Sequence, residues 1–188
     1  AGSVAADVTV TGTISVADAS SVLGTSYDIL DDAATVAAAI TAGNAEVNGA
    51  ASVATNGGAV DLSFADADSL LNGNGTAPAQ TGSVAADVTV TGTISVAQAS
   101  DVLGTSYDIL DDAATVAAAM NAGDAEVNNA QAIDTTHDGN VDLSFAEADA
   151  LLNGNGTATQ TGTGPENVTV TGTITVGQAS DVLGTSYD

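Results

Sequence analysis

The sequence contains no lysine, no arginine and no cysteine in 188 residues. Surfaces that bind nucleic acid or anionic lipid are rich in Lys and Arg, so the composition excludes both of these modes of binding. The absence of cysteine excludes disulfides, thiolate metal ligands and a cysteine nucleophile. No apolar run approaches the roughly 18 residues that indicate a membrane-spanning helix, so we expect no insertion into a membrane.

The charge that is present is of one sign. The chain carries 24 Asp and Glu residues and a formal net charge of −24. Strongly acidic chains are often disordered, but an apolar fraction of 44% and only two prolines favour a folded protein. Because no basic side chain is available to the carboxylates, we expect their partners to be cations, above all Ca²⁺.

Long stretches of the sequence recur with a period of 80 residues. Residues 2–17 are identical to residues 82–97, and residues 22–39 are identical to residues 102–119. The heptapeptide VTVTGTI begins at positions 8, 88 and 168. The sequence therefore predicts one repeat at 1–80, a second at 81–160 and part of a third at 161–188.

Each repeat alternates strand-like and helix-like patterns. Alternating β-branched residues indicate strands, and capping residues before Ala-rich runs indicate the starts of helices. Turn residues mark the boundaries between them. In the first repeat they predict strands at 8–16, 26–30, 45–54 and 60–63, a helix that begins after Ser15 and ends near Gly24, and helices at 31–43 and 64–71. The strand–helix junctions at 14–19, 30–34 and 62–67 resemble one another at offsets of 16 and 48 residues, which suggests a shorter ancestral unit.

Strands that are separated by helices pair in parallel through crossover connections. We therefore predict a mixed β/α repeat protein, a solenoid-like stack of short parallel strands and short helices in which neighbouring units bury each other's apolar faces. The alternative is a string of 80-residue beads, each an immunoglobulin-like β-sandwich. The helical pattern at 31–43 counts against the beads.

The motifs VTVTGTISVAQAS and SYDILDDAATVAAA resemble the repeats of giant secreted bacterial surface proteins, of the adhesin or haemolysin-type calcium-binding kind. The resemblance covers most of each repeat. It implies an extracellular or cell-surface location and a structural or adhesive role that often depends on calcium. The Gly-Gly-x-Gly-x-Asp nonapeptides of haemolysin-type repeats are absent here, so the resemblance does not extend to their β-roll.

One segment of the second repeat has the spacing of a calcium loop. Asp134, Asp138 and Asp142 occupy positions 1, 5 and 9 of an EF-hand-like pattern, with Gly139 at position 6. Position 12 is Phe145, and the nearest acid follows two residues later. The predicted ligands of Ca²⁺ are Asp134, Thr136, Asp138, Asn140, Asp142 and Glu147. The alternative is an ordinary Asp-Gly turn at the surface.

Several acids recur at the starts of predicted helices, where a carboxylate caps the free N–H groups. Asp31, Asp32, Asp66 and Glu147 are therefore interpreted first as helix-capping residues. Since no basic residue can neutralise them, cation bridging between repeats or subunits is a second interpretation.

No catalytic constellation is recognisable. His137 is the only histidine, no Lys, Arg or Cys can assist it, and no Gly-x-Ser-x-Gly motif occurs. We expect no enzyme, but a structural segment of an extracellular filament, sheath or adhesin stalk that assembles with itself head-to-tail and is stabilised by Ca²⁺. The alternative is a calcium-dependent adhesive or ligand-binding module of a cell-surface protein.

Overall fold

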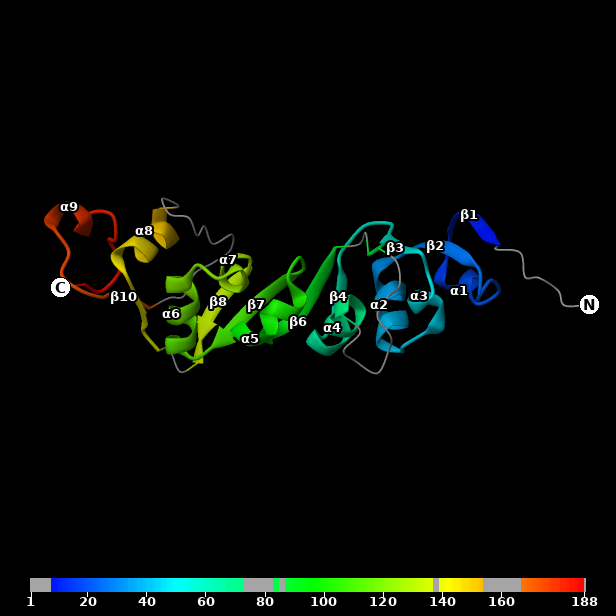
Figure 1. The fold of residues 1–188 in the computed structure, drawn as a ribbon, viewed down its shortest axis with the longest axis horizontal. Helices are drawn as coiled ribbons and strands as arrows, with labels where there is room; N and C mark the ends of the chain where they lie inside the picture. The colour runs from blue at the N-terminus through cyan, green and yellow to red at the C-terminus, as the bar shows by residue number, and fades with distance from the viewer. Residues whose placement is uncertain (1–7, 73–82, 85–86, 137–138, 154–166, 188) are drawn as a thin grey trace, which may run out of the picture. The chain divides into compact units, whose positions relative to one another are not determined.

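The computed structural model describes residues 8–72, 83–84, 87–136, 139–153 and 167–187. The chain forms two compact units, unit 1 at Ala1–Thr91 and unit 2 at Gly92–Asp188. In Figure 1 the colour runs from blue to green along unit 1 and from green to red along unit 2.

The described part of unit 1 alternates short strands and short helices. In chain order they are β1 (Thr9–Ile14), α1 (Val16–Ala19), β2 (Ser26–Asp31), α2 (Ala33–Thr41), α3 (Ala45–Asn48), β3 (Ser52–Thr55), β4 (Val60–Leu62), α4 (Phe64–Asn72), β5 (Ser83–Val84) and the start of β6 (Val88–Ile94). The boundary between the two units lies within β6.

Unit 2 follows the same order of strands and helices after the end of β6. Its described elements are α5 (Val96–Ala99), the 3-10 turn η1 (Ser100–Val102), β7 (Ser106–Asp111), α6 (Ala113–Ala122), α7 (Ala125–Asn128), β8 (Ala132–Thr135), β9 (Val141–Leu143), α8 (Phe145–Asn153), β10 (Val168–Val170) and α9 (Val176–Ala179). The protein is thus a mixed α/β chain.

Every strand pairing whose register is described is parallel. The strand orders are β1-β2-β3-β5, β4-β6-β7-β8 and β10-β9, and the parallel registers join β1 to β2, β2 to β3, β3 to β5, β4 to β6, β7 to β8 and β9 to β10. The prediction of parallel strands alternating with short helices is confirmed. Immunoglobulin-like sandwiches consist of antiparallel sheets, so the described strands do not fit that alternative.

Local sequence accounts for the longer helices. In α2, Asp32 is the N-cap and Val36, Ala39 and Ile40 are the buried residues, at helical spacing on one face. The helix α6 has the same start and ends at Gly123, whose φ of +72° places it in the left-handed region that glycine readily adopts. The helices predicted at 31–43 and 64–71 are both present as α2 and α4.

The segment 45–54 differs from the prediction of a strand. Residues Ala45–Asn48 form the short helix α3, and only Ser52–Thr55 form a strand. The hydroxyl of Tyr27, a residue of β2, donates a hydrogen bond of 2.7 Å to the carbonyl of Glu46 in this helix. A single helical turn is unstable by itself, so a tertiary contact, which is invisible in the local pattern, decides this segment.

The core of each unit consists of the same residue positions. In unit 1, Tyr27, Ile29, Val36, Val47 and Val53 are at most 1% exposed. Their counterparts in unit 2, which are Tyr107, Ile109, Val116, Val127 and Ile133, are at most 3% exposed. None of the helices in the described ranges is long and apolar enough to cross a membrane, which agrees with the expectation of no membrane insertion.

Candidate functional site

The predicted calcium ligands lie on and around the turn between β8 and β9. Asp134 is exposed on β8, where Ile133 and Thr135 on either side of it are buried. Asp142 is likewise exposed on β9, between the buried Val141 and Leu143. The period-two alternation of a strand thus directs both carboxylates to the solvent.

A hydroxyl-to-carbonyl hydrogen bond closes this turn. The Thr135 Oγ1 donates to the carbonyl of Gly139 at 2.9 Å, and the Thr135 N–H donates to Asp134 Oδ1 at 2.8 Å. In the first repeat Thr55 Oγ1 donates to the carbonyl of Gly58 at 3.0 Å, although that turn lacks most of the acids. The same contact therefore forms with and without the candidate ligands.

Gly139 has a steric role of its own. A Cβ added at this position would lie 2.9 Å from the Cβ of Ala113, the first residue of α6. Real Cβ atoms essentially never come so close. The glycine at position 6 of the calcium-loop pattern is thus also explained by the close approach of the turn to a helix.

The remaining candidate ligands that the structure describes lie in the turn between β8 and β9 and in α8. Thr136 is half-buried, Asn140 is exposed, and Glu147 is half-buried in the first turn of α8, where its N–H donates to Ser144 Oγ at 3.2 Å. Asp138 and His137 lie outside the described residues. Within the described ranges, no group of three or more Asp, Glu and His side chains is placed to hold a metal ion. The calcium site stays a prediction from the spacing in the sequence.

The repeated Asp-Asp pair at the end of β2 and β7 has a clear structural task. Asp32 is the N-cap of α2, and its two carboxylate oxygens accept from the N–H and the hydroxyl of Thr35 at 2.9 and 2.6 Å. Asp31 accepts from the N–H of Val16, the first residue of α1, at 2.9 Å. The pair therefore caps two helices at once.

The second repeat reproduces these contacts. Asp112 accepts from the N–H and the hydroxyl of Thr115 at 3.0 and 2.6 Å, and Asp111 accepts from the N–H of Val96 at 3.0 Å. The hydroxyl of the partner threonine is the largest cause of a lowered pKa at both Asp32 and Asp112. The interpretation of Asp31 and Asp32 as helix caps is confirmed, since N–H groups and hydroxyls stabilise the charge. At Asp66 and Glu147 the cap is instead the preceding serine, whose Oγ accepts from the N–H of the acid.

Removal of one such cap gives a test with a pH signature. We expect Asp112→Ala to lower the midpoint of thermal unfolding by a few degrees at neutral pH, because α6 loses its N-cap. The folded-state pKa of Asp112 is lowered, so its contribution is complete above the ordinary pKa of about 3.9 and is lost as the pH falls through the folded value. The difference from the unmodified protein should therefore vanish in acid, as measured by circular dichroism melts across pH.

Asp124 is the matched control for this experiment. It occupies the N-cap of α7 but makes no capping hydrogen bond with its side chain. Asp124→Ala removes the same charge from the same unit and should leave the midpoint nearly unchanged. Equal losses in the two variants would show that net charge, and not the cap, is responsible.

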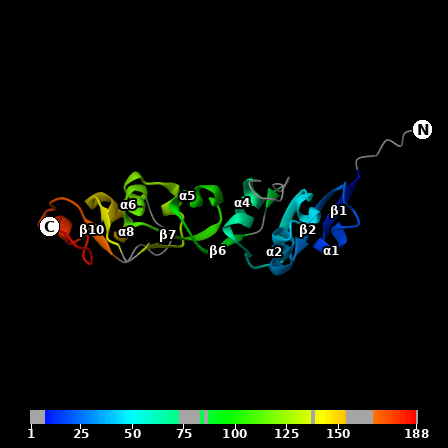
Figure 2. The ribbon, with the colours of Figure 1, turned by 90° about the horizontal axis from the view of Figure 1, so that it is seen from below.

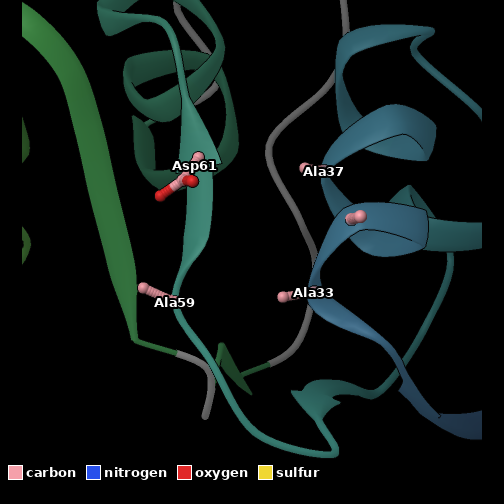
Figure 3. A pocket seen from close by; sticks show the side chains of 5 residues that line it. Ala33, Ala37, Ala59 and Asp61 are labelled. Atoms are coloured by element: carbon pink, nitrogen blue, oxygen red, sulfur yellow. The ribbon is translucent and has the colours of Figure 1, made fainter.

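A pocket in unit 1 offers little to a ligand. It has a volume of about 380 Å³ and is lined by Ala33, Ala34, Ala37, Ala59 and Asp61. Figure 3 shows Ala33 and Ala37 projecting from α2 toward β4, the strand that carries Asp61. Ligand sites combine apolar or aromatic walls with several converging polar groups. Four methyl groups and one carboxylate do not match that description.

The sequence did not reveal the seam at which one sequence repeat joins the next. In unit 1, β4 of the first repeat pairs with the start of β6 of the second, with Val60 opposite Val88 and Leu62 opposite Val90. In unit 2, β9 of the second repeat pairs with β10 of the third in the same way. The recurring VDLSFA and VTVTGT motifs mark the strands of the seam in the sequence. Their spacing does not show that these strands pair with each other.

Equivalent hydrogen bonds form at the two seams. The N–H of Val60 donates to the carbonyl of Asp87 at 2.7 Å, and the N–H of Val141 donates to that of Asn167 at 2.8 Å. Thr91 Oγ1 donates to the carbonyl of Leu62 at 3.1 Å, and Thr171 Oγ1 donates to that of Leu143 at 3.1 Å. Within the described ranges, the first and second repeats thus contribute the strands β4 and β9 to pairing with the following repeat.

Comparisons of the chain with models of protein families, with curated proteins and with solved structures find no match. Its functional assignment therefore depends on its own residues and contacts.

Proposed function

We propose that this chain is a structural repeat segment of an extracellular filament, sheath or adhesin stalk, in which successive repeats join head-to-tail into a solenoid-like stack. The observation that carries the proposal is the seam of parallel strands. In both described seams a strand of one repeat pairs with the VTVTGTI strand of the next, β4 with β6 and β9 with β10, so a repeat adds a strand to the sheet of its neighbour. Stacks of this kind gain stability from every added interface.

The side chains at the seams suit a load-bearing and not a chemical role. Val60, Leu62, Val141 and Leu143 are at most 1% exposed. Burying one such side chain contributes about 1.5–3 kcal/mol, and the parallel ladder adds backbone hydrogen bonds. An extracellular or cell-surface location is part of the proposal, and it rests on the resemblance of the repeats and on their acidic composition.

The net charge of −24 is the reason why the proposal includes cations. Two carboxylates 4 Å apart repel each other by about 1 kcal/mol in water and more where the dielectric constant is lower. Chains that associate with this charge must separate their carboxylates or bridge them, and Ca²⁺ bridges carboxylate oxygens well. We therefore assign Ca²⁺ the role of stabilising the assembly.

The proposal is tested by electron microscopy and sedimentation velocity on the purified chain with Ca²⁺ and with EGTA. We expect elongated assemblies and a higher melting midpoint in Ca²⁺, and we expect EGTA to reverse both. Mg²⁺ and NaCl at matched ionic strength separate specific bridging from simple screening. Monomers under all of these conditions would refute self-assembly, and an unchanged midpoint would refute the role of Ca²⁺.

A calcium-dependent adhesive module is the second candidate, and the spacing of Asp134, Asp138 and Asp142 is what favours it. If these residues form a site, Asp138→Asn should remove much of the rise in melting midpoint that Ca²⁺ causes. Asp61→Asn is the matched control, because Asp61 occupies the position in β4 that Asp142 occupies in β9. Equal responses in the two variants would assign the effect of Ca²⁺ to the general negative charge.

A further inference from the structure

Two asparagine–glycine pairs lie wholly within the described residues, one at Asn48 and Gly49 and the other at Asn56 and Gly57. An asparagine side chain that precedes glycine is open to attack by the backbone nitrogen of the glycine, because glycine has no Cβ to hinder the approach. The reaction alters the main chain, so the conformation and the hydrogen bonds of each pair decide whether it takes place. The two pairs belong to the same repeat and differ in both respects.

Asn56 lies in the exposed turn between β3 and β4. Its N–H donates to the carbonyl of Asp31 at 2.9 Å, and Asp31 is the last residue of β2, the strand that Figure 2 shows beside β1 in blue. The side-chain amide of Asn56 and the N–H of Gly57 have no hydrogen-bond partner in the part of the chain that the structure describes. Gly57 has a φ of +133°, and a Cβ added to it would meet no atom within 4 Å. The space around the reacting nitrogen is therefore open.

The contacts that hold this turn do not involve the atoms that would react. Cyclisation joins the Cγ of Asn56 to the nitrogen of Gly57, and the rest of the ring consists of the Cβ, the Cα and the carbonyl carbon of Asn56. The N–H of Asn56 remains bonded to Asp31, and Thr55 Oγ1 still donates to the carbonyl of Gly58 at 3.0 Å. The ring can thus form while both of these hydrogen bonds are kept.

The pair at Asn48 has the opposite surroundings. Asn48 is the last residue of α3, and the N–H of Gly49 donates to the carbonyl of Ala45 at 2.9 Å. A Cβ added to Gly49 would lie 3.1 Å from the Ala45 carbonyl oxygen and 3.2 Å from the hydroxyl of Tyr27. Cyclisation here would take the nitrogen that makes the helical hydrogen bond. The helical turn that Tyr27 holds would therefore have to open first.

We infer that Asn56 is a site of spontaneous modification, at which the folded chain converts the asparagine to isoaspartate and aspartate through a cyclic imide with Gly57. The nitrogen of Gly57 attacks the Cγ of Asn56, and the bond from this Cγ to the side-chain nitrogen breaks. That nitrogen leaves as ammonia and takes the proton of the Gly57 N–H. Water then opens the ring at either of its carbonyl carbons and returns a proton to the nitrogen of Gly57. Water is the only co-reactant, and the inference does not depend on the proposed function.

The turn has room for the longer main chain of isoaspartate. The hydroxyl-to-carbonyl contact that closes it joins Thr55 to Gly58, three residues apart, and the same contact in the second repeat joins Thr135 to Gly139, four residues apart. Isoaspartate lengthens the main chain by a single carbon atom, which is less than the additional residue of the second turn. We therefore expect β4 to keep its pairing with β6 while the turn before it gains a negative charge.

The two pairs can be compared within one peptide of the full chain. The protein is incubated at mildly alkaline pH below its melting midpoint, and in parallel in urea, because the attacking nitrogen must lose its proton. Cleavage at acidic residues releases residues 47–61, which contain both pairs and separate them from the other asparagine–glycine pairs of the chain. Tandem mass spectrometry should show isoaspartate forming several-fold faster at Asn56 than at Asn48 in the folded chain. In urea the two rates should become similar, since α3 is then absent.

Two matched variants complete the test. Asn56→Gln should abolish the reaction at this position, because the longer side chain cyclises far more slowly, and circular dichroism should show an unchanged melting midpoint. Asn48→Gln should leave the rate at Asn56 unchanged. A folded chain in which Asn56 reacts no faster than Asn48 would overturn the inference. Conversion of Asn56 to aspartate alone would overturn it as well, because direct hydrolysis without the ring gives no isoaspartate.

Discussion

Replacement of Tyr107 by alanine is expected to lower the free energy of unfolding of unit 2 by about 3–5 kcal/mol, the usual loss when a fully buried aromatic side chain is removed. Tyr107 is 1% exposed, and its hydroxyl donates to the carbonyl of Glu126 at 2.8 Å. Burial, together with the charge of Glu126, raises its pKa to about 12. The variant loses the ring from the core and leaves the carbonyl of Glu126 in α7 without this partner. Denaturant titration followed by circular dichroism measures the loss.

The third repeat supplies the control for this experiment. Tyr187 occupies the same position of the repeat as Tyr27 and Tyr107, but it is 40% exposed. Tyr187→Ala should therefore change the free energy of unfolding by less than about 1 kcal/mol. Equal effects at the two positions would mean that the tyrosine ring does not act through burial. Tyr107→Phe separates the contribution of the ring from that of the hydroxyl, and we expect the smaller part of the loss from the hydroxyl.

The second large effect is expected at the seam between repeats. Leu62 is 1% exposed on β4, and Leu62→Ala should cost about 2–5 kcal/mol, because it removes a buried isobutyl group and leaves a cavity. Its carbonyl receives the hydrogen bond of Thr91. We therefore also expect faster amide hydrogen exchange in the first half of β6, at Val88–Thr91, than in the unmodified chain.

Leu71 is the matched control for the seam. It lies on α4, nine residues from Leu62, and is 37% exposed. Leu71→Ala removes the same atoms from a partly solvated position and should cost well under half as much. A loss of similar size in both variants, or unchanged exchange at Val88–Thr91 in Leu62→Ala, would contradict the assignment of β4 as the strand that supports the following repeat.

Some elements could be predicted because their signals are local. The helix of residues 33–41 follows from Asp32 as N-cap, an alanine-rich run and apolar residues at helical spacing. The strand–helix junctions at Ile14, Leu30 and Leu62 were recognised by their similarity, and each lies where a strand is followed by a helix. The capping role of Asp32 needs only a residue three positions away, so sequence reasoning could find it.

Other features depend on residues that are distant in the sequence. Asp31 caps α1 from 15 residues away, and the turn of helix at Ala45–Asn48 is held by the hydroxyl of Tyr27, 19 residues earlier. The prediction of a strand at 45–54 was wrong because its alternating pattern contains no information about that hydroxyl. Of the candidate calcium ligands, Asp134 and Asp142 lie on β8 and β9, the strands before and after one turn, but no cluster of acids surrounds them among the described residues.

The sequence by itself determined the 80-residue period, the excess of acids without any basic residue, and the alternation of strands and helices that requires parallel pairing. These are properties of composition and of local periodicity. Only the tertiary structure decided which strands are partners. Parallel strands of three residues, such as β4 and β9, can pair with any strand of similar pattern. Their choice of the following repeat depends on the helices and turns that bring Val60 to Val88 and Val141 to Val168.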